Sequence, residues 1–507
     1  MQLIFKALFI AFGLSVLMVS THAVIDIENG YYMTLEECIA MTLRQNQTID
    51  NSYLDRITQK NALVNAEHAF NPQGTLTIGP SWTHAITPTS KAESGSANVS
   101  TAWTQALKTG GSLNFAWNKS TTLLGKEAKR STYSDGFSLG FTQPLLKGGG
   151  FTMGTLSLTR AYLTEQGNVL SLKSTLMTNI QTAITRYRSY INQIESLKIQ
   201  RRSFEREKIR LEQQEALVEA GRLAKNDLIK SRAAIASREL QLLEVENTTD
   251  DARIDLLRFM NMDTGIPLLP IIDLQVEEPQ LPSLEDAMEI VYENDPSYQQ
   301  ALIALRNAEL SLKEAKDGLL WDLGFTGSIA SNGNAGRTWG LATYNAADMK
   351  RKTWSLGLNL VIPLNKRDRA TSYLNAKIAM RKARIDFQNT LDNLKADVIK
   401  QMRTIENNYK RVQFAKENTR LNAEDLEVAE IRFNAGLITN FELVTTQDNY
   451  VTTENTELTA KITYLNNLVE FDRRLGTLLD TLQINIDERA AQSKRIRAQS
   501  GMPPPST

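Results

Sequence analysis

The pattern of hydrophobic and polar positions runs through the same succession twice along the chain. Residues 33–70 and 284–316 both have the period of an amphipathic helix. They begin with the similar sequences TLEECIAMTLRQNQ and SLEDAMEIVYENDP. Both openings have the spacing of a capping box, with Thr34 before Glu37 and Ser283 before Asp286. The pattern therefore predicts an internal duplication in which each half begins with a helix.

Strand-like alternation follows each of these helices. Apolar residues occupy every second position over 113–117 and 137–141 in the first half, and over 354–362 in the second. A period of two predicts strands with one apolar face and one small or polar face, which we expect within residues 75–143 and 323–362. Such alternation is typical of a half-buried strand in a soluble sandwich and equally of a strand in a membrane barrel. Trp is enriched at membrane interfaces, so four tryptophans in or near these segments favour the membrane: Trp103, Trp117, Trp339 and Trp354.

Long helices are predicted after the strands, at residues 152–218 and 367–434. No Pro occurs between Gly150 and Gly221, and neither Gly nor Pro occurs between Pro363 and Gly436. Apolar residues recur there at steps of three and four, as in a coiled-coil seam. The seam residues are Met177, Ile180, Ile184, Tyr187, Ile191 and Ile194 in the first copy, and Leu391, Leu394, Val398, Met402, Ile405, Tyr409 and Val412 in the second. A helix of this size is on the order of 100 Å long, so it must pack lengthwise against partners.

Matching turns end the two long helices, with the words EAGRLAKNDL and NAGLITNFEL. Gly221 and Gly436 are expected to adopt the conformation that ends a helix. Asn226 and Asn440 are the expected N-caps of return helices at residues 226–260 and 440–479. A Pro-rich connector at 263–283 separates the first repeat, 24–262, from the second, 284–480, and the polar tail at 481–507 is expected to be disordered.

The N-terminal residues predict export. Lys6, an apolar run at 7–19 and small residues up to Ala23 are typical of a secretory signal peptide over residues 1–23. The run is shorter than the about 20 residues that span a membrane. The chain has 57 Lys and Arg against 57 Asp and Glu, so no basic excess favours nucleic acid as a partner. Its one cysteine, Cys38, cannot form a disulfide within the chain.

Enzymatic patterns are weak in this sequence. The word GFSLG around Ser138 has the spacing of a hydrolase nucleophile elbow, but Ser138 lies inside an alternating strand and no His follows His84. His68, His84 and Cys38 are too far apart in sequence for a metal-ligand motif, and no phosphate-binding loop motif occurs. We therefore expect no catalytic residues, no metal site and no cofactor, and the chain is not expected to be an enzyme.

The order of these elements resembles the TolC family of outer-membrane efflux proteins over about residues 33 to 480. The resemblance rests on the two opening helices, on the strand-to-helix junctions SLGFTQPLLKGGG and LGLNLVIPLN, and on the two turns. It implies an α+β membrane protein built from a duplicated repeat of helix, strands, long helix and return helix. It further implies a homotrimer with a twelve-stranded outer-membrane β-barrel, four strands from each chain, continued by a long periplasmic α-helical barrel.

The resemblance also indicates a periplasmic aperture at the turns. Glu442 matches the family's first acidic position there, Thr445 stands at the second, and Asp227 lies nearby in the first repeat. A single ring of Glu442 implies a gate less negative than one with two acidic rings. The alternative interpretation is that both acids only favour a helix N-terminus. The tip residues expected to contact an adaptor are Ala220, Gly221, Arg222, Leu223, Ala435, Gly436, Leu437 and Ile438.

An additional hairpin, 99–107 and 113–119 joined around Gly110, departs from the family's two strands per repeat. It is expected either to extend an external loop or to alter the barrel seam. The implied function is an exit duct from an inner-membrane pump and a periplasmic adaptor, either for efflux or for type I secretion, with outer-membrane lipid around it. The alternative is a periplasmic coiled-coil scaffold without channel activity, and the sequence does not specify the substrate.

Overall fold

The computed structural model describes residues 31–484, except residues 88–89, 125–131, 221–224, 336–337 and 350. The predicted signal peptide and most of the polar tail lie outside the described residues. The chain forms two compact units. The first unit contains residues 31–46, 180–278 and 408–466, and the second contains residues 47–179, 279–407 and 467–484.

The first unit is held by a core around a short parallel pair of strands. β1 (Tyr31–Met33) pairs with β6 (Leu268–Pro270) beside α1 (Leu35–Gln45) and α5 (Lys225–Phe259). Two buried tyrosines of α4 (Leu156–Glu219) fasten this pair, because Tyr187 donates to the carbonyl of Met33 at 2.8 Å and Tyr190 to that of Leu268 at 2.7 Å. Each tyrosine hydroxyl thereby makes the hydrogen bond that a polar group needs inside an apolar core.

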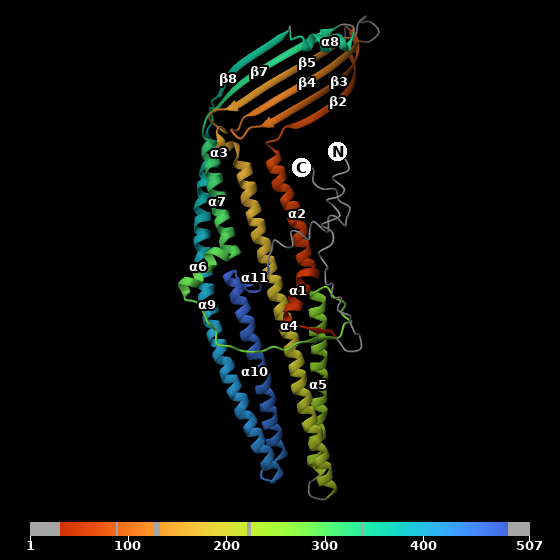
Figure 1. Ribbon diagram of the computed structural model, residues 1–507, viewed down its shortest axis with the longest axis vertical. Helices are drawn as coiled ribbons and strands as arrows, with labels where there is room; N and C mark the ends of the chain where they lie inside the picture. Colours follow the sequence, from red (N-terminus) through yellow and green to blue (C-terminus); the bar gives the residue numbers. More distant parts are fainter. Residues whose placement is uncertain are drawn as a thin grey trace, which may run out of the picture. The chain divides into compact units, whose positions relative to one another are not determined.

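The second unit is built around one antiparallel sheet of six strands in the order β2-β3-β4-β5-β7-β8, drawn as arrows in Figure 1. The strands are β2 (Gln73–Thr87), β3 (Ser90–Ala106), β4 (Ser112–Leu124), β5 (Thr132–Pro144), β7 (Asp322–Ala335) and β8 (Lys352–Val361). The predicted additional hairpin is therefore present as β3 and β4. Whereas the family resemblance implies four strands from each chain, this sheet has six, because β2 and β3 pair into it over their whole length.

The opening stretch of each repeat is two helices rather than one. The first repeat has α1 followed by α2 (Gln47–His68), and the second has α6 (Leu284–Asn294) followed by α7 (Pro296–Asp317). Extended backbone at Asn46 and Asp295 separates the two members of each pair. Pro296 explains the second break, because the residue before a proline is disfavoured in helical conformation. Asp295 then caps α7 by accepting from the Tyr298 amide at 2.8 Å.

The long helices are continuous. After the short α3 (Phe151–Gly154), α4 has 64 residues and α9 (Arg367–Asn434) has 68, while α10 (Asn440–Leu475) is followed by the short α11 (Leu478–Thr481). Seam positions such as Ile180, Ile184 and Ile405 are buried, as the three–four spacing predicts. Among the described helices, none is both long and apolar enough to cross a membrane.

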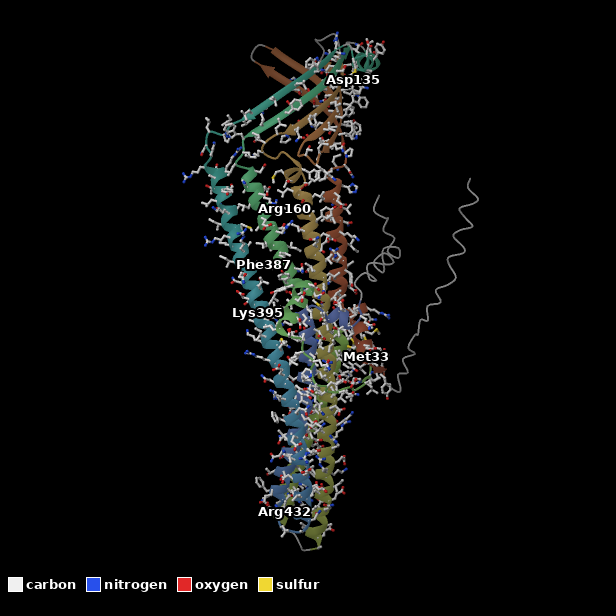
Figure 2. All side chains as sticks on the ribbon, turned by 60° about the vertical axis from the view of Figure 1, so that its left-hand side comes forward. Met33, Asp135, Arg160, Phe387, Lys395 and Arg432 are labelled. Atoms are coloured by element: carbon white, nitrogen blue, oxygen red, sulfur yellow. The ribbon has the colours of Figure 1, made fainter. Side chains whose placement is uncertain are left out.

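A short helix covers part of the sheet. α8 (Trp339–Ala347) packs on β5 and β7, close to Asp135, which Figure 2 labels. The Asp135 carboxylate is buried and accepts from Trp117 Nε1 at 2.6 Å and from Thr343 Oγ1 at 2.5 Å, and Lys119 Nζ lies 3.7 Å away. This buried charge is therefore paired and hydrogen-bonded, as an ionised group under a helix must be.

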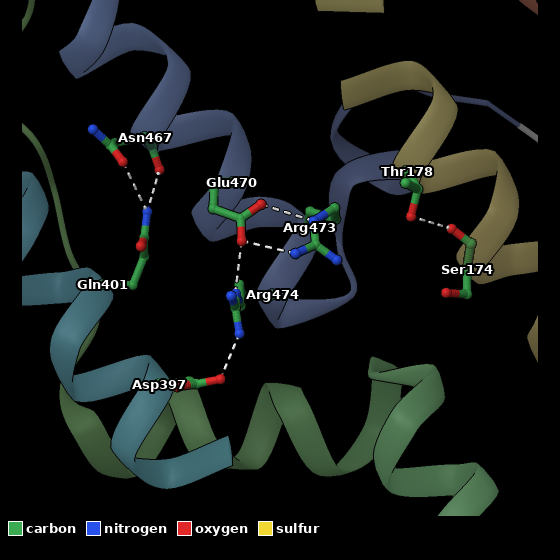
Figure 3. Close-up of polar contacts among 8 residues, drawn as sticks. All are labelled: Ser174, Thr178, Asp397, Gln401, Asn467, Glu470, Arg473 and Arg474. Atoms are coloured by element: carbon green, nitrogen blue, oxygen red, sulfur yellow. Dashed lines mark hydrogen bonds and ion pairs between the residues drawn. The ribbon is translucent and has the colours of Figure 1, made fainter. Parts of the chain in front are cut away.

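An ion-pair network joins α9 and α10 in the second unit (Figure 3). Arg474 bridges Asp397 at 2.5 Å and Glu470 at 2.7 Å, and Arg473 binds the same Glu470. Burial raises the pKa of the Glu470 carboxyl, but hydrogen bonds from the two arginines outweigh it and hold the pKa below its usual value. Gln401 also donates to the backbone carbonyl of Asn467 at 2.9 Å.

Asp472 also lies on α10, but its pKa is raised rather than lowered. This carboxyl therefore makes the stability of the second unit depend on pH. Burial raises the pKa of its carboxyl to about 6. The folded state therefore binds the proton more readily than the unfolded chain, so the stability falls as the pH rises from about 4 to about 6. We expect Asp472→Asn to stabilise the unit by on the order of 1–2 kcal/mol at pH 7, allowing for solvent screening, and to have little effect at pH 4. Thermal unfolding at the two pH values measures this difference.

Asp386→Asn is the matched control, because Asp386 is exposed on α9. Its effect should stay within about 0.5 kcal/mol at both pH values. An equal gain for Asp472→Asn at pH 4 and pH 7 would show that titration of this carboxyl does not cause the stabilisation.

Candidate functional site

The two faces of the six-stranded sheet differ in chemistry, except where α8 covers the sheet and the apolar face carries the Lys119–Asp135 pair. The strand registers align large apolar side chains on one face of neighbouring strands, for example Trp103, Phe115, Leu139 and Ile329. Many of these side chains are exposed: Leu76, Ile78, Trp82, Trp103, Leu139, Trp354, Leu356, Leu358 and Leu360. Exposed apolar surface that continues over six strands marks a site of contact with lipid or protein.

Small and hydroxyl-bearing side chains form the opposite face. One row across the sheet runs from Thr104 through Asn114, Gly140 and Ser328 to Ser355. Serine hydroxyls of neighbouring strands bind each other on this face, at 2.7 Å for Ser81 with Ser96 and 2.8 Å for Ser328 with Ser355. This face is therefore suited to water, whereas the other face is suited to an apolar environment.

The turn after α9 ends the helix as the sequence predicts. Gly436 has a φ of 72°, its amide donates to the Phe433 carbonyl at 2.9 Å, and the Leu437 amide donates to the Arg432 carbonyl at 2.9 Å. These two bonds form a Schellman motif, in which glycine avoids the strain of the left-handed conformation. Figure 2 labels Arg432 at this end of α9. The corresponding residues Gly221, Arg222 and Leu223 lie outside the described residues, and Ala220 is exposed at the end of α4.

Glu442 lies in a capping box at the start of α10. Its carboxylate accepts from the Thr439 amide at 2.8 Å, and its own amide donates to Thr439 Oγ1 at 3.2 Å. Thr439 is therefore the N-cap, and the expectation of Asn440 was wrong. Thr445 lies on the same exposed side, with its hydroxyl donating to the Phe441 carbonyl at 2.8 Å. Asp227 belongs to α5, near that helix's first residue.

Asn440 forms hydrogen bonds between helices of the first unit instead of capping α10. Its side-chain oxygen accepts from Gln214 of α4 at 3.0 Å, and its nitrogen donates to Ser231 of α5 at 3.1 Å. Gln214 and Ser231 are both buried. The side-chain amide of Asn440 thus links the start of α10 to α4 and α5 of the first repeat, and the sequence alone does not reveal this role.

Two exposed hydrophobic side chains flank the turn. Leu437 is 74% exposed and Phe441 is 78% exposed, whereas Ile438 packs against the buried cluster of Leu426, Ala429 and Leu443. Phe441 was not among the predicted tip residues. A groove of about 700 Å³ lies beside it, with apolar walls that include Phe433 and Val444 and with polar walls that include Lys230.

A group of charged residues is buried within the first unit. Glu207 and Arg210 of α4 are 2% and 6% exposed, with 3.3 Å between Glu207 Oε2 and an Arg210 terminal nitrogen. Arg238 of α5 contacts Asp448 of α10 and is also attracted to Glu207. Burial lowers the pKa of both guanidinium groups, and the Glu207 charge opposes this shift.

The weak enzymatic pattern has no supporting geometry. Ser138 lies on the polar face of β5 between Ala116 and Ala330, so the strand-to-helix turn of a nucleophile elbow is missing at this residue. Among the described residues, no group of three or more His, Cys, Asp or Glu side chains could hold a metal ion. Cys38 is buried among apolar side chains, and burial raises the pKa of its thiol to about 12.

Comparison with solved structures shows which known proteins share this fold. The CmeC outer membrane channel of Campylobacter jejuni is 13% identical, with a TM-score of 0.67 over 88% of this chain and 86% of that chain. The open state of the MtrE outer membrane channel of Neisseria gonorrhoeae is 15% identical, with a TM-score of 0.62 over 88% of this chain and 89% of that chain. VceC of Vibrio cholerae, an outer membrane protein, is 10% identical, with a TM-score of 0.62 over 87% and 96%. The fold, with its two-faced sheet, is that of the outer-membrane channels.

A family model matches the sequence of the second repeat. The family model described as outer membrane efflux protein matches residues 288–477. The second repeat thus matches the outer membrane efflux protein family, in agreement with the resemblance to TolC-family proteins. The location of the chain is the outer membrane with an extension into the periplasm, and the family and fold are those of channels rather than enzymes. Comparison with curated proteins gives no significant match.

Proposed function

We propose that the chain is the outer-membrane exit duct of a tripartite efflux pump or of a type I secretion system. It passively conducts substrate received from an inner-membrane transporter and a periplasmic adaptor. The observation that carries this proposal is the sheet with one exposed apolar face and one face of small hydroxyl and amide side chains. A strand wall between lipid and water needs this division of side chains.

The assembly in this proposal is a homotrimer that binds an adaptor at the helical turns. Leu437 and Phe441 support an adaptor contact, because large apolar side chains exposed at a turn are typical of docking surfaces. Arg222, Leu223 and Ile438 remain candidate contacts on the sequence argument alone. The aperture in this proposal is lined by Glu442, with Thr445 and Asp227 beside it.

Membrane fractionation followed by planar-bilayer recording tests the function. We expect trimeric protein in the outer-membrane fraction and stepwise single-channel currents after reconstitution. A soluble periplasmic protein without channel activity would instead support the coiled-coil scaffold. Copurification with an adaptor and an inner-membrane transporter identifies the system that the duct serves.

Ion selectivity tests the proposed role of Glu442. In a trimer, three Glu442 carboxylates around one axis attract cations, so Glu442→Ala should reduce the cation-to-anion permeability ratio by roughly twofold or more at low salt. Reversal potentials in a salt gradient measure this ratio. The charge effect should fade at high salt because ions screen it.

Glu442→Gln separates charge from structure. Glutamine can keep the capping box with Thr439 but removes the charge. Equal loss of cation preference in the Ala and Gln variants supports the aperture. If the Gln variant keeps the original selectivity, Glu442 is only a helix cap.

A further inference from the structure

The hairpin of β2 and β3 continues both faces of the sheet. Leu76 and Ile78 of β2 lie on the apolar face, where Ile78 aligns with Val99 of β3. Thr77 and Ser100 align on the polar face, which continues into Asn118 of β4. An external loop would not need one apolar face and one polar face. β2 and β3 therefore have the side-chain pattern of a barrel wall, as the other four strands do.

The turn between β3 and β4 is fixed against the end of β5. The Gly150 amide donates to the Thr109 carbonyl at 3.0 Å, and Gln143 Nε2 donates to the same carbonyl at 2.9 Å. Backbone packs so closely here that a Cβ on Gly154 would lie 2.3 Å from the Gly110 nitrogen and 2.3 Å from the Lys108 oxygen. These contacts explain why glycine occupies position 154 in the strand-to-helix junction and position 110 in the turn. They also hold β3 beside β4.

The two edges of the sheet lack strand partners within the described residues. β2 pairs with β3 alone, and β8 pairs with β7 alone. Unpaired backbone groups are costly in a hydrocarbon environment, so a sheet in a membrane must close without free edges. A second copy of the chain offers the complementary edge, because β2 and β8 are the first and last strands of an antiparallel series of even number.

We propose that three copies of the chain close their sheets edge to edge, with β8 of one copy pairing with β2 of the next, into a barrel of eighteen strands. This inference rests on the proposed homotrimer and follows from the six strands of each sheet. It differs from the twelve strands that the family resemblance implies. Because barrel diameter grows roughly linearly with strand number, the opening is about half as wide again as that of a twelve-stranded barrel.

Cysteine cross-linking between copies tests the seam. Cys38 is the chain's one cysteine and is fully buried, so introduced thiols can be followed without removing it. One new cysteine is placed on the polar face of β8 and another on that of β2. The β8 positions are Thr353, Ser355 and Asn359, and the β2 positions are Thr75, Thr77 and Ser81. The nine pairs sample six registers between copies, centred on the overlap of the two strands, and oxidation should convert at least one pair into covalent trimers on non-reducing gels.

Two matched sets of variants make the result decisive. In the first, the same β8 positions are combined with Asn114, Ala116 and Asn118 of β4, which is the seam strand if four strands per chain close the barrel. In the second, Ser81→Cys with Ser96→Cys joins aligned residues of one chain and shows that neighbouring strands can be cross-linked.

The outcomes separate the two levels of the proposal. Covalent trimers from β8–β2 pairs support eighteen strands. Trimers from β8–β4 pairs overturn this number, as does a failure of every β8–β2 pair when the Ser81–Ser96 control forms. The native mass of the same sample shows whether it is trimeric. A trimeric mass without a β8–β2 seam rejects the strand number alone, whereas a non-trimeric mass rejects the homotrimer in the proposed function as well.

Discussion

Replacing Glu207 with glutamine should destabilise the first unit by about 3–5 kcal/mol. Glu207 is 2% exposed, and its negative charge attracts both Arg210 and Arg238. Without this charge, the positive charges of the two largely buried guanidinium groups are less fully balanced by negative charge. The nearby positive charge of Arg206 repels both groups further. A buried charge that has lost its partner is far more costly than one at the surface.

Thermal or denaturant unfolding followed by the helical circular dichroism signal measures this loss. Glu205→Gln is the control, because Glu205 is exposed on the same helix and its substitution should cost less than about 0.5 kcal/mol. Adding Arg210→Met to Glu207→Gln should recover part of the stability, since it removes one of the stranded charges. If Glu207→Gln melts like Glu205→Gln, the cluster does not stabilise the unit through charge.

Alanine at Gly154 should have the second largest effect, a loss of about 1–3 kcal/mol in the second unit. The new methyl group would meet the backbone of Lys108 and Gly110 at 2.3 Å, so the β3–β4 turn must move away from α3. Backbone cannot yield as a flexible side chain can. Gly110→Ala should act in the same direction, because its Cβ would lie 2.2 Å from the Gly148 oxygen and its φ is 84°.

Gly167→Ala supplies a control of opposite sign. Gly167 lies on α4 with open space around its Cβ position, so alanine should stabilise the helix by up to about 1 kcal/mol. The heat-induced gel shift of the detergent-solubilised protein measures all three variants. A Gly154→Ala protein that melts with the wild type would mean that the turn is not fastened to this junction.

The parts of the fold that follow from local chemistry could be predicted from the sequence. Gly436 ends α9 as its place after the periodic stretch predicts, and the apolar alternation gives the strands. The N-cap of α10 was assigned one residue late, because Thr439 and Asn440 are both good capping residues. Only the reciprocal bonds with Glu442 distinguish them.

Two features could not be predicted because they depend on tertiary context. Buried positions continue along α4 beyond Ile199 at steps of three and four, but Ser203, Glu207, Arg210 and Gln214 occupy them. A search for apolar seams therefore stops too early. The six-stranded sheet was missed for a different reason. Residues 99–107 of β3 were predicted as a strand, whereas β2 is rich in Thr, Gly and Ser and gives a weak strand signal alone.

The polar face of the sheet also bears on which part of the proposed duct can select ions by charge. Among the strand residues whose side chains the structure describes, Asp322 at the start of β7 is the only charged residue on that face. Lys147 and Arg369 approach its carboxylate at 3.4 Å and 3.9 Å. A wall of hydroxyl, amide and glycine positions sets up little fixed potential, so it does not sort solutes by sign. In the proposed duct, the reversal potential is therefore governed by the helical turns, and the strand-lined part contributes mainly a size limit.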